Sequence, residues 1–201
     1  ESPSLAEQAD RHALYQQAVN APGAHIDFIR KVYRGMQKRE PRVLKEDFCG
    51  TALMAAAWAQ RSPHNRAIGV DLDAEALAWG QRHNLELRGP ALARRVALVH
   101  GDVLEDRPHR ADIVCALNFS YNLLLARHQL LAYLRGARRS LLPGGLFLLE
   151  KGPPAARRPL SLARGVAALA ACSPVVNTDP HRSPVLLENL ERLARACRPE
   201  A

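Results

Sequence analysis

Short apolar segments alternate with helix-like segments between residues 42 and 150, and this alternation constrains the fold more than any other feature. Strands joined by helices pair in parallel and need cover on both faces. The sequence therefore predicts a doubly wound, Rossmann-like α/β fold with a mostly parallel sheet. We expect strands at 42–48, 67–72, 95–101, 111–118 and 146–150, and helices at 51–60, 74–87 and about 123–142.

The ends of the chain differ from this core. Two helices are predicted before it, at 4–19 and 25–38. After residue 151 the chain has no aromatic residue, and seven of its fourteen prolines lie there. A segment without aromatic side chains has little bulky apolar surface to bury. We divide the chain into a helical region (1–40), an α/β core (41–151) and an atypical C-terminal segment (152–201) that is partly loop with a terminal helix.

Charge, cysteine spacing and the distribution of apolar residues limit the classes of function that the chain could have. The net charge of +8 would suit a nucleic-acid partner, but the arginines are scattered and do not form a stripe, so nucleic acid is not favoured. The four cysteines form no CxxC pair, which argues against a zinc site. No long apolar run or secretory leader is visible, so we expect a cytoplasmic protein with no membrane partner.

Polar residues stand at four predicted strand ends. The first strand runs into "EDFCGTA" (46–52), the second ends at Asp71, the third leads to Asp102 and the fourth ends at Asn118. Ligands of doubly wound sheets bind beyond the carboxyl ends of the strands. Carboxylates there can accept hydrogen bonds from ribose hydroxyls and from an adenine amino group, which suits an adenosine-containing cofactor.

The motif series "EDFCGTA", "AIGVDLDAEAL", "HGDVLE", "ADIVCALNFSYN" and "LLPGGLFLLE" resembles the class I methyltransferases that use S-adenosylmethionine. The resemblance covers about residues 42–150. With "DRHALYQQAV" before it, the series looks like a bacterial branch of unassigned substrate. The family resemblance implies S-adenosylmethionine as cofactor and residues 1–40 as a lid.

The resemblance also implies roles for single residues. Glu46 falls near the cofactor's methionine amino group, Gly50 on the central glycine of the loop, and Asp71 on the ribose-binding acid. Asp102 matches the acid that binds the adenine amine, and Asn118 lies close to the methionyl end. The complete set of implied cofactor-binding residues is Tyr15, Glu46, Phe48, Gly50, Asp71, Leu72, Asp102, Val103 and Asn118.

Two departures from the family pattern stand in the first loop. Phe48 and Ala52 occupy positions where glycines are more usual, so we expect a different loop geometry. Asp47 falls on a usually apolar position, and we expect it to stabilise this turn.

Asp73 is predicted to cap the helix at 74–87, which leaves Asp71 to bind the ribose. No catalytic base and no metal ligand can be named.

Three functions remain open. The first is a methyltransferase with an unidentified acceptor, for which a small molecule is slightly favoured. The second is a nicotinamide-dependent dehydrogenase, which would need a GxGxxG turn that the sequence lacks. The third is a cofactor-binding domain of little activity, because the hairpin that normally follows the fifth strand is not found. The tail composition would also follow from a truncated gene or a shifted reading frame.

Overall fold

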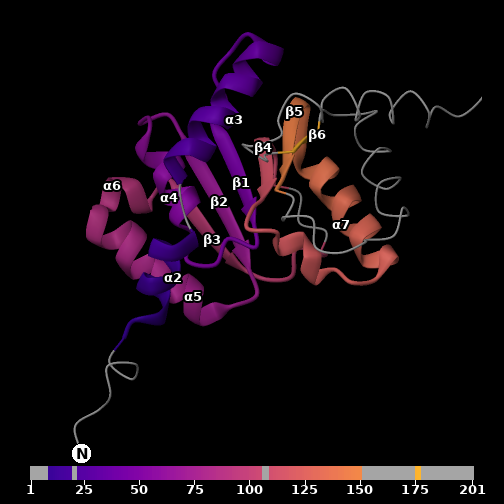
Figure 1. Cartoon of the computed structure of the whole chain (residues 1–201). Helices are drawn as coiled ribbons and strands as arrows, with labels where there is room; N and C mark the ends of the chain where they lie inside the picture. The colour runs from indigo at the N-terminus through magenta and orange to yellow at the C-terminus, as the bar shows by residue number, and fades with distance from the viewer. Residues whose placement is uncertain (1–8, 20–21, 106–108, 151–174, 178–201) are drawn as a thin grey trace, which may run out of the picture.

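The computed structural model describes residues 9–19, 22–105, 109–150 and 175–177. Parallel strands form one sheet in the order β3-β2-β1-β4-β5-β6 (Figure 1). The strand order reverses between β1 and β4, which is where doubly wound sheets bind ligands. The strands are β1 (Val43–Asp47), β2 (Arg66–Asp71), β3 (Val96–His100), β4 (Ala111–Ala116), β5 (Leu141–Leu149) and β6 (Val175–Asn177).

Helices cover both faces of the sheet, as the doubly wound prediction requires (Figure 1). One core packs α3 and α4 against β1, β4 and β5 through Ile29, Trp58 and Leu44, and α7 covers the opposite face. The helices are α2 (Arg11–Val19), α3 (Pro22–Gln37), α4 (Leu53–Gln60), α5 (Ala74–Gly80), α6 (Pro90–Ala93) and α7 (Arg127–Ser140). Short π or 3₁₀ turns are η1 (Gln81–Leu85), η2 (Glu86–Arg88) and η3 (Ser120–Leu123).

The helix predicted at 4–19 begins later, at Arg11. Asp10 accepts hydrogen bonds from the backbone amides of His12 (2.9 Å) and Ala13 (3.1 Å), so its side chain caps α2. Residues 4–8 of the predicted helix lie outside the described residues. The second helix begins earlier than predicted, at Pro22, because proline suits the first turn of a helix.

The segment predicted as one helix at 74–87 is divided into α5, η1 and η2. Its middle packs tightly on the loop after β1, since a Cβ on Gly80 would lie 2.2 Å from the carbonyl oxygen of Thr51. Asn84 donates a hydrogen bond to the same oxygen at 2.8 Å. Tertiary packing on Thr51 therefore accompanies the change from α-helix to π turn.

The C-terminal half of the core also differs in its boundaries. The helix predicted at 123–142 is preceded by the turn η3 and begins at Arg127, while β5 begins at Leu141 and not at 146. The sequence did not predict β6, which pairs in parallel with the end of β5. The predicted loop at 152–159 and the predicted helix at 186–197 lie outside the described residues.

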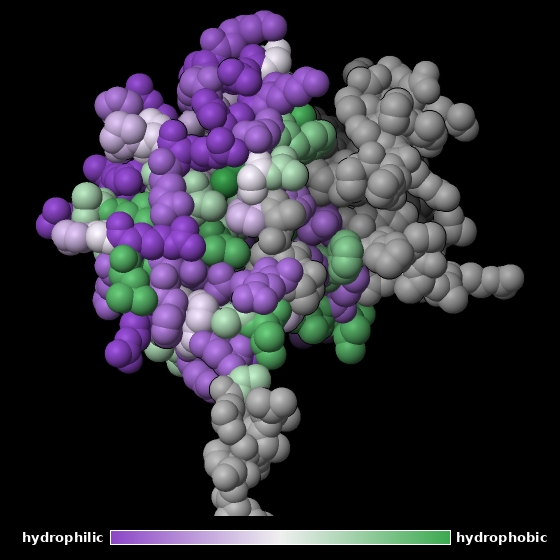
Figure 2. Space-filling model, turned by 60° about the vertical axis from the view of Figure 1, so that its left-hand side comes forward, coloured by the Kyte–Doolittle hydropathy of each residue, from purple (hydrophilic) through white to green (hydrophobic). Residues whose placement is uncertain are grey.

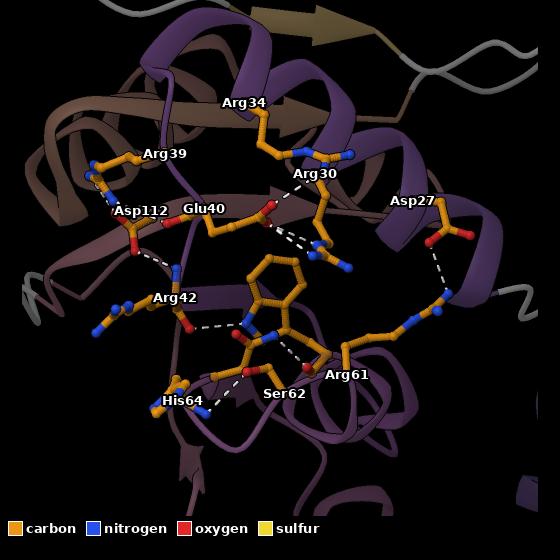
Figure 3. A network of polar contacts seen from close by, with 12 residues as sticks. Asp27, Arg30, Arg34, Arg39, Glu40, Arg42, Arg61, Ser62, His64 and Asp112 are labelled. Carbon is orange, nitrogen blue, oxygen red and sulfur yellow. Dashed lines mark hydrogen bonds and ion pairs between the residues drawn. The ribbon is translucent and has the colours of Figure 1, made fainter.

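A polar network fastens the amino ends of the strands (Figure 3). Asp112 on β4 accepts hydrogen bonds from the backbone amides of Arg42 (2.8 Å) and Val43 (3.0 Å) and from the hydroxyl of Tyr33 (2.9 Å). The guanidinium group of Arg39 forms an ion pair with Oδ1 of the same Asp112 carboxylate at 2.8 Å. These contacts join α3, β1 and β4 at the edge opposite the strand ends that carry the predicted site.

The outer surface gives little sign of a large apolar interface on the side where α6 lies. Most side chains there are hydrophilic, and the apolar ones form small separate patches (Figure 2). In the part of the chain that the structure describes, no helix combines the length and apolar character needed to cross a membrane.

Candidate functional site

The loop between β1 and α4 has an unusual backbone. Phe48 (φ 59°), Gly50 (φ 52°) and Ala52 (φ 54°) all adopt the left-handed conformation, which costs a residue other than glycine about 1–2 kcal/mol. We expected these two departures to change the loop geometry from that of the family, and this stays a prediction; both residues take a left-handed conformation that glycine adopts readily. Contacts elsewhere must hold these two residues in place.

Gly50 links this loop to the end of β2. Its backbone N–H donates a hydrogen bond to Oδ2 of Asp71 at 2.6 Å. A Cβ on Gly50 would find no protein atom within 4 Å, so the loop faces open space there. The structure therefore brings two of the predicted cofactor-binding residues together, next to a space that a ligand could fill.

Asp71 and Asp73 have different hydrogen-bonding roles at the start of α5. Asp73 accepts hydrogen bonds from the amides of Glu75 and Ala76, both at 3.0 Å, which confirms the predicted helix cap. Asp71 accepts from the amides of Gly50 and Asp73, the latter at 2.9 Å. Each carboxylate oxygen has a second acceptor site, so Asp71 can still bind hydroxyl groups of a ligand.

Leu72 follows Asp71 with 64% of its surface exposed. The ring of His100 lies with Nε2 3.0 Å from the Leu72 carbonyl oxygen and supports the backbone at this point. An exposed apolar side chain beside an acid can cover the flat face of a base while the acid binds the sugar.

Glu46 is buried, with 6% of its surface exposed. Its Oε2 accepts a hydrogen bond from the amide of Ala55 at 3.0 Å, in the first turn of α4, where Ala52 offers no side-chain cap. Burial, with the charges of Asp71 and Asp47 nearby, raises the pKa of Glu46 from 4.5 to about 8. Glu46 is thus largely protonated at neutral pH, and a cation placed beside it would favour its ionised form.

Asp47 points to the opposite face of the sheet. It accepts a hydrogen bond from the hydroxyl of Tyr133 at 3.1 Å and pairs with the ammonium group of Lys45. Burial raises the pKa of Asp47 despite these partners. These partners lie on β1 and α7, and the expected role of Asp47 in stabilising the turn stays a prediction. Adjacent residues of a strand face opposite sides, which separates it from Glu46.

Asp102 and Val103 lie in the connection after β3. Asp102 accepts a hydrogen bond from the amide of Leu104 at 2.9 Å and is part-buried. Val103 packs against the core on the α7 side. The structure thus gives Asp102 a local turn contact and Val103 a packing role, while both remain near the carboxyl ends of the strands.

Asn118 ends the segment after β4 in a left-handed conformation (φ 52°), and Phe119 follows with φ 58°. The amide of Asn118 donates to Oε2 of Glu150 at 2.7 Å, and Oε1 of Glu150 lies 3.7 Å from Nε2 of His25. Burial alone would raise the pKa of Glu150, but His25 and the Asn118 amide lower it. Sequence reasoning missed Glu150 and His25, although Glu150 is the last residue of the last predicted strand.

Tyr15 lies on α2 with 51% of its surface exposed. The helix rests on α5 through the hydrogen bond from Trp79 Nε1 to Asp10 (2.8 Å) and the ion pair of Arg11 with Glu75 (2.5 Å). These contacts hold α2 beside the start of α5, which follows Asp71. Among the described residues, no hydrogen bond or ion pair joins Tyr15 to the other predicted cofactor-binding residues.

Two other features of the described residues bear on where a ligand or metal could bind. Among the residues that the structure describes, no group of three His, Cys, Asp or Glu side chains could hold a metal ion. A shallow hollow of about 340 Å³ lies beside η1 and α6, and none of the predicted cofactor-binding residues lines it. The carboxyl edge of the sheet remains the candidate site.

A switch point between β1 and β4, with an acid at the end of β2 that holds the loop after β1, is typical of doubly wound, ligand-binding α/β proteins. Residues 48–145 match the family model described as a methyltransferase domain. The match covers just under half of the chain, and the fold is that of the class I methyltransferases. No curated protein sequence matches the chain.

Solved structures share the fold at low sequence identity. A sugar N-methyltransferase from Streptoalloteichus has a TM-score of 0.59 and 22% identity over 79% of this chain and 61% of its own. An amino pentose methyltransferase from Micromonospora echinaspora, with S-adenosylmethionine bound, has a TM-score of 0.59 and 23% identity over 76% and 59%. A methyltransferase from Clostridium acetobutylicum has a TM-score of 0.56 and 17% identity over 67% and 53%. The chain thus spans about 60% of the first two.

Proposed function

We propose that this protein binds S-adenosylmethionine at the carboxyl edge of the sheet and transfers its methyl group to a small-molecule acceptor. The contact of Gly50 with Asp71 beside an open space carries the proposal, because it pairs a side-chain-free backbone with an acid at the switch point. The methyltransferase family match and the neighbours with bound cofactor support S-adenosylmethionine as the cofactor.

The residues at this edge fit the parts of that cofactor. Asp71 would accept the ribose hydroxyls, with exposed Leu72 against the adenine. Asp102 would accept from the adenine amine, with Val103 as its apolar neighbour.

The methionyl end requires different chemistry. Its ammonium group would lie near Glu46, whose high pKa falls when a cation approaches. Gly50 and Phe48 would form the loop beneath it, with Asn118 on the other side and Tyr15 on a lid formed by residues 1–40. The bound cofactor supplies an electrophilic methyl group, and the protein aligns the acceptor with it.

The acceptor is proposed from a weaker resemblance. Two neighbours are named as a sugar N-methyltransferase and an amino pentose methyltransferase, which supports a small molecule that presents an amine or a hydroxyl group. Nucleic acid is less favoured. No residue is assigned as the catalytic base, because alignment alone can account for much of the rate of a methyl transfer.

The division into a lid (1–40), a cofactor-binding core (41–151) and an atypical C-terminal segment (152–201) is part of the proposal, as are the cytoplasmic location and the bacterial branch. A nicotinamide-dependent dehydrogenase is not favoured, because "EDFCGTA" replaces the GxGxxG turn. An inactive cofactor-binding domain is not favoured either.

A thermal-shift measurement with S-adenosylmethionine, S-adenosylhomocysteine and NADH tests the proposal. A ligand at one hundred times its Kd stabilises the folded state by about 2.7 kcal/mol, which raises Tm by about 5–10 °C in a domain of this size. We expect that shift with the first two ligands. A shift with NADH alone would assign the dehydrogenase function instead.

A further inference from the structure

Tyr133 contacts two consecutive residues at the end of β1. It lies on α7 with no exposed surface. Its hydroxyl donates a hydrogen bond to Oδ2 of Asp47 at 3.1 Å, and its ring meets the ring of Phe48 edge-on with centroids 5.5 Å apart. A single side chain, 86 residues away in sequence from Asp47, therefore holds both sides of the Asp47–Phe48 peptide bond.

Phe48 needs such support because its left-handed conformation is unfavourable for a residue with a large side chain. The next two residues of the loop depend on that conformation. Cys49 donates its amide to the carbonyl oxygen of Val70 at 3.1 Å, and Gly50 donates to Asp71 at 2.6 Å. The backbone angle at Phe48 therefore sets where the Gly50 amide and the proposed cofactor loop lie.

The group that receives the Tyr133 hydroxyl is costly to bury. Asp47 has 1% of its surface exposed, and its partner Lys45 is also buried. Well-packed apolar side chains often replace such a buried ion pair with no loss of stability. The stability of the fold is therefore a weak explanation for burying the charged groups of Asp47 and Lys45. A carboxylate fixed in this position does, however, give the Tyr133 hydroxyl a directional hydrogen-bond acceptor beside the loop.

We infer that Tyr133 is a positioning residue for S-adenosylmethionine, which rests on the proposed function. Anchored on Asp47, it holds Phe48 in the left-handed conformation, and Phe48 in turn directs Gly50 toward Asp71 and the cofactor. Among the described residues, Tyr133 makes no hydrogen bond and no ring contact with Gly50 or Asp71. Its effect on the cofactor passes through the backbone of the loop.

A matched pair of variants separates positioning from stability. Tyr133→Phe removes the hydroxyl bound to Asp47 and keeps the ring against Phe48. Tyr33→Phe removes an equally buried hydroxyl bound to Asp112 at 2.9 Å, at the opposite edge of the sheet. We expect both variants to lower Tm, but only Tyr133→Phe to raise the Kd for S-adenosylmethionine, by about threefold to tenfold, as measured by isothermal titration.

A second variant tests the route through Phe48. Glycine adopts the left-handed conformation without support, so Tyr133→Phe should weaken binding by less than twofold when Phe48→Gly is already present. If Tyr133→Phe does not fold, Phe48→Leu removes the ring contact from the other side and should raise Kd by a similar factor.

An unchanged Kd in the folded Tyr133→Phe protein would overturn the inference. So would an unchanged Kd in Phe48→Leu when that variant is used instead, or equal weakening of binding with and without Phe48→Gly. If the wild-type protein itself binds no S-adenosylmethionine, the proposed function fails, and the inference fails with it. Wild-type binding with no effect of the variants rejects the inference alone.

Discussion

The backbone amide of Gly50 donates a hydrogen bond to Oδ2 of Asp71 across 2.6 Å, although 21 residues separate them. One residue ends β2, and the other lies in the loop that leaves β1. The carboxylate that fixes the loop is thus bonded to a residue that faces open space. Loop geometry and ligand binding therefore depend on one side chain, and variants at this position test both.

Asp71→Ala should lower the affinity for S-adenosylmethionine by about 10-fold to 100-fold. A hydrogen bond to a charged group is worth about 1.5–3 kcal/mol, so the loss of a single bond to the ribose already accounts for this factor. Isothermal titration at a temperature well below Tm measures the change.

Asp73→Ala is the matched control for Asp71. It removes the side-chain cap of α5, which should cost about 1 kcal/mol of unfolding free energy. The carboxylate of Asp73 accepts hydrogen bonds from the amides of the helix. We therefore expect the Kd of Asp73→Ala for S-adenosylmethionine to stay within twofold of the wild-type value. Equal losses of affinity in both variants would show that Asp71 acts only through general stability.

Glu46 should make stability fall as pH rises. Its pKa is about 8 in the folded protein and near 4.5 when unfolded, so the folded state binds more protons between these values. The contribution of Glu46 to the free energy of unfolding is therefore largest below about pH 4.5 and is lost as pH rises toward 8. Urea unfolding across that range, compared with Glu46→Gln, measures the effect.

Glu46→Gln cannot ionise, so the difference between the two proteins isolates this group. At about pH 8.5 the variant should be more stable than the wild type by about 1–3 kcal/mol, and the difference should shrink toward about pH 5. A difference that stays constant across this range would contradict the raised pKa.

Ala52→Gly should change stability by less than about 1 kcal/mol, although it removes a fully buried methyl group. Relief of the left-handed strain at φ 54° offsets the lost burial and the added chain entropy. Ala56→Gly removes an equally buried methyl from the interior of α4 without relieving strain, and should cost about 2 kcal/mol. Similar costs in urea unfolding would contradict the strain at Ala52.

Asp112→Ala should destabilise the fold by about 3 kcal/mol and leave cofactor affinity unchanged, because it removes the acceptor for four donors at the amino edge. Burial alone would raise the pKa of Asp112, but these donors lower it below its ordinary 3.8. Its stabilising effect is therefore present above about pH 4 and is lost as pH falls through the folded value. An equal acid sensitivity of the variant and the wild type in urea unfolding would contradict this role.

Most of the fold could be predicted from the sequence because apolar strand segments and helical periodicity are local signals. All five predicted strands overlap observed ones, and Asp73 caps α5 as its position before "AEAL" indicates. The exact boundaries depend on tertiary contacts. The helix around Gly80 changes its winding where it packs on Thr51, a contact that no local pattern reveals.

The site was less predictable for a related reason. The order of strand-end acids pointed to Asp71 and Glu46, but not to the burial that protonates Glu46. The left-handed backbone of Phe48 contradicts its residue type, because distant contacts with Tyr133 outweigh a local preference. Tyr133 on α7 and Glu150 after β5 lie far from these residues in sequence and meet them only in the folded protein.

Isothermal titration of the wild-type protein with S-adenosylmethionine and S-adenosylhomocysteine decides whether the carboxyl edge of the sheet holds this cofactor. We expect saturable binding of both ligands at one site, with an affinity that Asp71→Ala lowers and Asp73→Ala preserves. No heat of binding with either ligand, from protein whose folded state circular dichroism verifies, would show that the protein does not bind S-adenosylmethionine.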